Sequence, residues 1–216
     1  MLLARRIAQL VIGLFLYGLA LAMMLRAGIG VGPWDVLSQG IMNHTGIPFG
    51  WVTNLLGALV LLLWIPLRQR PGIGTVANVL LLGTSAQVGL AFIPEQTVLW
   101  MRIVLFAAGL LLLAVATGLY IGAAFGPGPR DGLMTGINKR FGVPIWAART
   151  VVEVSVLAVG WMLGGNVGVG TLAFALLIGP LCNLTIPLLR VRVPVPAPAV
   201  ASTVPVQLPP TVPGRS

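Results

Sequence analysis

Two short segments of the chain each place a carboxylate directly after a Gly-Pro pair. Asp35 ends the stretch Gly32–Asp35, and Asp131 ends the stretch Gly128–Asp131. Proline is favourable at the first position of a helix, and a carboxylate in the first turn complements the helix dipole. Each segment therefore predicts the start of a short helix. Such a carboxylate either lines a central cavity, where it binds a cation or exchanges a proton, or it only caps its helix.

A second pair of charges lies inside an apolar stretch. Arg149 and Glu153 are four residues apart, on one face of a helix predicted over 143–163. At ~1.5 Å per residue, Glu153 lies about 15 Å along that helix, near the middle of a bilayer. Charges at such depth usually face the interior of a bundle. Either these two side chains bind a ligand, or they only neutralise each other. Asn54 and Asn78 either join the same site or bridge helices.

The composition excludes a soluble protein. Hydrophobic residues make up 57% of the 216 residues and charged residues only 8%, with a mean hydropathy of +1.01. Soluble domains carry roughly 25% charged residues. Six apolar stretches each approach the ~20 residues that a helix needs to cross a bilayer. They cover approximately 7–25, 47–67, 72–93, 98–123, 143–163 and 168–189. We therefore predict an all-α polytopic membrane protein with six transmembrane helices.

The chain contains an ungapped duplication in which residue 32 corresponds to residue 128, an offset of 96. GPWDVL at 32–37 matches GPRDGL at 128–133, and GIGT at 72–75 matches GVGT at 168–171. Each half holds three predicted spans, so the second half enters the membrane in the opposite direction. We predict two inverted three-helix repeats, each with a short re-entrant or interfacial helix, over residues 33–41 and 129–137. The repeats cover residues 1–96 and 97–189.

The positive charges predict the orientation of these spans. With a cytoplasmic N-terminus, ten of the thirteen Lys and Arg residues lie on the cytoplasmic side, and only Arg26 and Arg102 lie outside. We expect Trp34 in the outer and Trp64 in the inner aromatic belt. Residues 190–216 are rich in proline and are predicted to form a disordered cytoplasmic tail.

Several other chemistries are not expected. His44 has no carboxylate or cysteine at metal spacing, and the single cysteine, Cys182, has no partner. The chain carries neither a phosphate-binding loop nor a hydrolase nucleophile motif. We therefore expect no metal, no cofactor and no enzymatic activity. The formal charge of +9 includes a single Lys and no basic run, so a nucleic-acid partner is not expected either.

The two Gly-Pro-x-Asp segments, with the glycines and prolines that follow them, resemble the bacterial YczE/YyaS/YitT-like integral membrane protein family. The positions that carry this resemblance are Gly30 to Asp35, Gly40, Gly46 and Pro48, and Gly126 to Met134, Gly136, Gly142 and Pro144. The resemblance covers about residues 5–190. It implies a polytopic helical fold in the bacterial plasma membrane and no particular activity.

Together these features favour a small inner-membrane transporter of an unidentified small solute or ion. Its central site is expected between the repeats, formed by Asp35, Asp131, Arg149, Glu153, Asn54 and Asn78. Because 22.6 kDa is small for a complete transporter, a homodimer in the lipid bilayer is expected. Two alternatives remain: a substrate-binding membrane subunit of a multi-component transporter, and a non-transporting membrane partner of another enzyme.

Overall fold

The computed structural model describes residues 2–191, and this part of the chain is entirely α-helical with short connections. The helices are α1 (Leu2–Ala27), α2 (Pro33–Thr45), α3 (Phe49–Leu63), α4 (Ile73–Phe92), α5 (Leu99–Gly122), α6 (Pro129–Phe141), α7 (Ile145–Met162) and α8 (Val169–Leu189). Five are long and apolar enough to cross a membrane, or six if α2 and α3, which are bent by 119° at their junction, form one span. The prediction of an all-helical polytopic membrane protein is confirmed. Most of the predicted tail, residues 192–216, lies outside the described residues.

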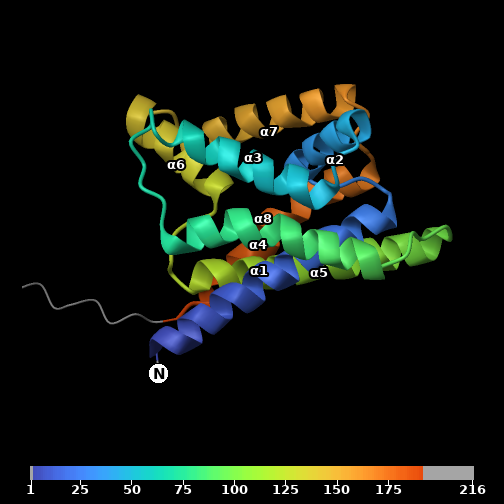
Figure 1. Cartoon of the computed structure of the whole chain (residues 1–216), viewed down its shortest axis with the longest axis horizontal. Coiled ribbons are helices and arrows are strands. Elements are labelled where there is room, and N and C mark those ends of the chain that lie inside the picture. The colour runs from blue at the N-terminus through green and yellow to red at the C-terminus, as the bar shows by residue number, and fades with distance from the viewer. Residues whose placement is uncertain (1, 192–216) are drawn as a thin grey trace, which may run out of the picture.

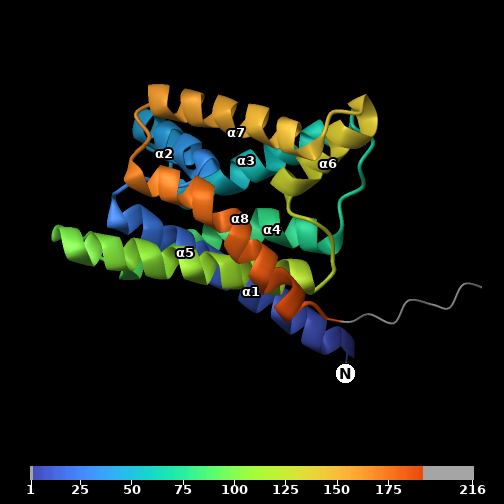
Figure 2. The same cartoon turned by 180° about the vertical axis from the view of Figure 1, so that it is seen from behind.

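The helices form two layers. One layer contains α1, α4, α5 and α8, and the other contains α2, α3, α6 and α7 (Figure 1). The view from behind shows the same grouping (Figure 2). Within the first layer, α1 packs between α4 and α5, and α8 packs against α5.

The first turns of α1 and α5 each hold the end of the other helix. Arg6 Nε donates a hydrogen bond to the carbonyl oxygen of Ala123, at 2.9 Å. Arg102 Nε donates in the same way to the carbonyl oxygen of Ala27, at 2.7 Å. A guanidinium beside the last carbonyls of a helix satisfies acceptors that lack a partner within the helix and complements the dipole. These two contacts, which correspond at the offset of 96, fix α1 and α5 as an antiparallel pair.

The loops that follow α1 and α5 return into the bundle and pair with helix starts from the other half of the chain. The backbone N–H of Gly170, at the start of α8, donates to the carbonyl oxygen of Ile29 at 2.8 Å. The N–H of Gly74, at the start of α4, donates to the carbonyl oxygen of Phe125 at 2.9 Å. Irregular backbone at membrane depth needs such partners, because lipid offers none.

Each loop then turns into a short helix that begins inside the protein. The turns use Gly30 and Gly126, with φ of 112° and 115°, a conformation that side chains with a Cβ rarely adopt. Pro33 at the start of α2 and Pro129 at the start of α6 are both buried. Both helix starts were predicted, but each helix is four residues longer than expected and ends just before a glycine, Gly46 or Gly142, that caps it.

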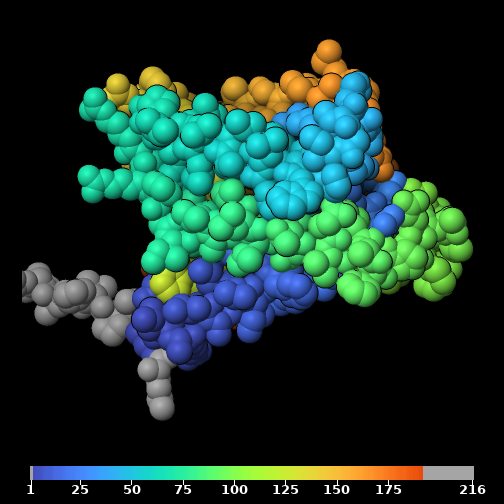
Figure 3. Space-filling model, in the orientation of Figure 1, coloured from blue at the N-terminus to red at the C-terminus, as the bar shows by residue number. Residues whose placement is uncertain are grey.

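Helices α3 and α4 are held together by close backbone contact and by amide side chains. Asn54 Oδ1 accepts a hydrogen bond from the backbone N–H of Gly83 at 2.9 Å. Gln87 Oε1 accepts one from the N–H of Gly50 at 3.1 Å. A Cβ added to Gly83 would overlap the carbonyl oxygen of Gly50. Figure 3 shows the face of the molecule on which the atoms of these two helices meet.

The corresponding helices of the second half, α7 and α8, diverge from their connecting loop (Figure 2). Of their residues, only Ala148 and Gly160 of α7 and Gly170 and Thr171 of α8 are buried. A Cβ added to Gly179, which corresponds to Gly83, would meet no atom of the described chain within 4 Å. The two halves therefore have the same helices but differ in how their last two helices pack.

This difference predicts unequal effects of one substitution at two corresponding glycines. Gly83→Val should destabilise the protein by about 1–3 kcal/mol, because the new side chain forces α3 away from α4. Gly179→Val should change stability far less, because space is free there, while the small gain in helix propensity over glycine is the same at both positions. Thermal unfolding of both variants in detergent tests this. An equal loss of stability would contradict the described packing.

Candidate functional site

A cavity of about 100 Å³ lies where the first turns of α2 and α6 meet, with walls from both layers. This is enough space for several water molecules or one small solute. Three of the four acidic residues of the chain line it, as do both tyrosines. The structure brings all six predicted site residues to this cavity: Asp35, Asp131, Arg149, Glu153, Asn54 and Asn78. Their roles remain predictions.

Asp35 is the most buried of the charged groups. Its side chain is 3% exposed, and the nearest cationic atom, Arg130 Nη1, lies 3.7 Å from Oδ1. No hydrogen-bond donor of the described residues reaches Oδ1. A buried carboxylate without donors is unfavourable unless it is protonated or pairs with a cation.

Asp131, at the corresponding position of the second half, has different surroundings. It is exposed, and Oδ2 accepts a hydrogen bond from the hydroxyl of Tyr120 at 3.1 Å. The ring of Tyr120 contacts that of Tyr17 edge-on, with centroids 5.9 Å apart. In the first half the position of Tyr120 is taken by Met24, which has no hydroxyl to donate. The duplication therefore produces one hydrogen-bonded and one unbonded carboxylate.

Trp34 and Arg130 occupy corresponding positions of the two halves and contact each other. The guanidinium carbon of Arg130 lies 5.1 Å from the centroid of the Trp34 ring, within the range of a cation–π interaction. The expectation that Trp34 lies in an aromatic belt is wrong, because the side chain is 8% exposed beside the cavity. Trp64 is likewise buried, and its Nε1 donates to the carbonyl oxygen of Pro129 at 3.0 Å. Arg130 was not predicted as a site residue, although the repeat aligns it with Trp34 beside the two aspartates.

The remaining predicted residues divide between the site and the scaffold. Arg149 Nε donates to Glu153 Oε1 at 2.8 Å, so these two charges pair with each other at the edge of the cavity. Asn54 bonds α4 through both its oxygen and its nitrogen. Asn78 is buried on α4 next to Gly128, at the start of α6.

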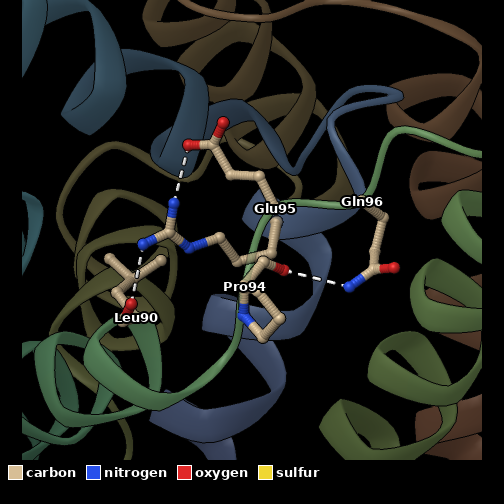
Figure 4. Close-up of polar contacts among 5 residues, drawn as sticks. Leu90, Pro94, Glu95 and Gln96 are labelled. Atoms are coloured by element: carbon tan, nitrogen blue, oxygen red, sulfur yellow. Dashed lines mark hydrogen bonds and ion pairs between the residues drawn. The ribbon is translucent and has the colours of Figure 1, made fainter.

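The fourth acidic residue does not line the cavity. Glu95 follows α4 and accepts a hydrogen bond from Arg26 Nη1 at 2.6 Å. The same guanidinium donates to the carbonyl oxygen of Leu90 at 2.7 Å. Figure 4 shows Glu95 and Leu90 on either side of this group. Because Glu95 is largely exposed, its ion pair contributes little to stability.

The fold and the charged cavity define a polytopic helical membrane protein. The chain belongs to a family described as "Family of unknown function (DUF6198)", whose model matches residues 4–187. It is 38% identical over 175 residues to an "Uncharacterized protein" of Haemophilus influenzae, covering 81% of this chain and 80% of the relative. It is 29% identical over 172 residues to the "Uncharacterized membrane protein YczE" of Bacillus subtilis, with coverage of 79% and 80%.

A third relative is the "Uncharacterized protein YyaS" of Bacillus subtilis, which is 25% identical over 184 residues, with coverage of 83% and 91%. No solved structure matches the chain significantly. The similarity to YczE and YyaS confirms the family that the Gly-Pro-x-Asp segments indicate.

The geometry around Asp35 predicts strong coupling between Asp35 and Arg130. Arg130→Gln removes the one ion-pair partner that Asp35 has among the described residues, and should cost about 3 kcal/mol of stability. Asp35→Asn should cost less, because Arg130 still contacts Trp34. The double variant should recover most of the loss. Chemical unfolding of the four proteins in detergent measures this coupling. If Arg130→Gln costs the same in the wild-type background and in the Asp35→Asn background, the two groups do not interact.

Proposed function

We propose that this chain is a small bacterial inner-membrane transporter whose substrate, a small solute or ion, binds in the central cavity. The observation that carries the proposal is the concentration of charge there: three of four acidic residues line a cavity between two helix starts. Charges within a membrane bundle are costly, and they typically mark a substrate or ion pathway. In the proposed orientation both termini are cytoplasmic, α2 lies toward the outside and α6 toward the cytoplasm.

The proposed architecture is a pair of inverted repeats. Supporting it, the capping contacts of Arg6 and Arg102 correspond at the offset of 96, as do the backbone contacts of Gly74 and Gly170. The antiparallel arrangement of α1 and α5 is the one that inverted repeats require. Transporters built in this way bind their substrates between the repeats, at the ends of interrupted helices.

In the proposed mechanism the two halves exchange conformations. The contact of α3 with α4 closes one side of the cavity, whereas α7 and α8 are separated on the other side. In the alternative state α7 closes on α8 while α3 separates from α4. Because the repeats are inverted, this exchange would expose the cavity to the opposite side of the membrane.

Ligand binding to the purified protein tests the proposed site. We expect at least one compound in a panel of metabolites and ions, tested at several pH values, to raise the unfolding temperature. A ligand at 100 times its Kd stabilises by roughly 2.7 kcal/mol. The shift should be lost in Asp35→Asn and reduced in Asp131→Asn and Glu153→Gln, whereas Glu95→Gln, the matched control outside the cavity, should retain it.

Uptake of the same compound into proteoliposomes then tests transport itself. The proposal is contradicted if no compound in the panel binds. It is also contradicted if a compound binds but none of the three carboxylate substitutions weakens its binding. Co-purification of a stoichiometric ATPase would instead favour the substrate-binding subunit.

Cysteine cross-linking tests the exchange of conformations, in a Cys182→Ala background that removes the native thiol. Asn54→Cys with Thr84→Cys should cross-link readily, because Asn54 Nδ2 lies 3.1 Å from Thr84 Oγ1. The corresponding pair, Thr150→Cys with Pro180→Cys, should cross-link only when the protein enters the alternative state. Either cross-link should stop transport until it is reduced. If the second pair never cross-links under transport conditions, the exchange is wrong.

A further inference from the structure

We infer that the ligand of the central cavity is a small organic cation with N–H donors, of the guanidinium or alkylammonium class. We also infer that the side chain of Arg130 occupies its place in the described conformation. This inference rests on the proposed function and names its substrate class.

The charges that line the cavity favour a cation. Arg149 and Glu153 neutralise each other through their contact of 2.8 Å. The remaining groups are two carboxylates, Asp35 and Asp131, and one guanidinium, that of Arg130. The hydrogen-bond partner of Asp131 is the neutral hydroxyl of Tyr120. The cavity therefore has an excess of one negative charge when its acidic groups are ionised.

Aromatic side chains favour an organic cation over a metal ion. The cavity is lined by Tyr17, Trp34, Tyr120 and Phe174. Aromatic faces attract cations, with the largest effect for Trp and in sites shielded from water. The guanidinium of Arg130, 5.1 Å from the Trp34 ring centroid, shows that the site accommodates a planar organic cation.

Arg130 is held loosely enough to be displaced. Its nearest atom lies 3.7 Å from Asp35 Oδ1, beyond hydrogen-bond distance, and its side chain is 25% exposed. Asp35 Oδ1 thus remains a buried acceptor without a donor among the described residues. A free cation of the same chemistry could approach Oδ1 without the restraint of the α6 backbone, donate an N–H to it and contact Trp34.

Methylguanidinium is the probe that tests this inference, with methylurea as a neutral control of the same shape and acetate as an anion. Calorimetry and thermal unfolding of the full chain in detergent, at constant ionic strength, measure binding. We expect saturable binding of methylguanidinium and none of methylurea or acetate. Trp34→Leu should weaken binding about tenfold, whereas Trp34→Phe should retain most of it.

Arg130→Gln gives a more direct test than the Trp34 variants, because it removes the side chain that competes with the ligand for Asp35. Methylguanidinium should bind this variant about tenfold more tightly than wild type and should restore its unfolding temperature, whereas methylurea should not. Adding Asp35→Asn should abolish the rescue. Should Arg130→Gln not fold, Arg130→Lys keeps a charge that still competes for Asp35, so methylguanidinium should bind it about as tightly as wild type, and adding Asp35→Asn should abolish that binding.

Different outcomes of these experiments overturn the cation assignment and the proposed transporter function. If methylguanidinium binds neither wild type nor the Arg130 variants, the cation assignment is overturned. The same holds if Na⁺ or K⁺ at equal concentration stabilises the protein as much. If an anion or a neutral solute binds in a manner that requires Asp35 and is transported, the transporter stands and this substrate class fails. If no solute binds or moves at all, both fail.

Discussion

The rest of the structure depends on one constraint: backbone groups that leave a helix inside a membrane protein must find partners within the protein. The chain leaves its helices after α1 and again after α5, and each time a carbonyl oxygen accepts a hydrogen bond from a helix start in the other half of the chain, at Gly170 and Gly74. These contacts hold both loops in the interior. As a result α2 and α6 begin inside the protein, and their first turns bring two aspartates and the arginine between them to one cavity.

Duplication with an offset of 96 gives this cavity two similar walls, yet their chemistry differs. Trp34 and Arg130 correspond in sequence and contact each other. Two arginines at this contact would repel each other, whereas tryptophan and arginine attract. Met24 and Tyr120 also correspond in sequence but differ in chemistry. The hydroxyl of Tyr120 donates a hydrogen bond to Asp131, whereas Met24 has no hydroxyl and Asp35 Oδ1 has no donor among the described residues. Symmetric backbone contacts with unequal side chains thus produce a single asymmetric site.

Much of the fold could be predicted from the sequence, because hydropathy and helix-start chemistry are local properties. The six predicted apolar stretches agree with the observed helices to within two residues, except that α1 begins five residues earlier and α3 ends four residues earlier, and α2 and α6 begin at the predicted prolines. The repeat predicted that Asp35 and Asp131 share a cavity, whereas Arg149 and Glu153 were predicted from their depth in an apolar stretch. What could not be predicted depends on tertiary packing. Gly40 was expected near the end of α2, but it lies within that helix against Gly160 of α7. The prediction that Trp34 lies in an aromatic belt rested on its residue type, whereas in the structure its ring contacts the guanidinium of Arg130.

The unequal packing of the last two helices in each half also bears on the energetics of any conformational exchange. Closure of α3 on α4 uses two amide side chains that bond backbone N–H groups, and two glycines that allow close approach. In the second half the four corresponding positions hold Thr150, Asn183, Trp146 and Gly179. The first two are shorter, and the tryptophan takes the place of a glycine, so α7 and α8 cannot form the same contacts. In the proposed exchange these contacts would favour the described state in the absence of ligand, and a ligand that moves the equilibrium must bind the other state more tightly. A cation that satisfies Asp35 and releases Arg130 would supply such a difference, because it replaces the contacts of Arg130 with Asp35 and Trp34 that join α6 to α2.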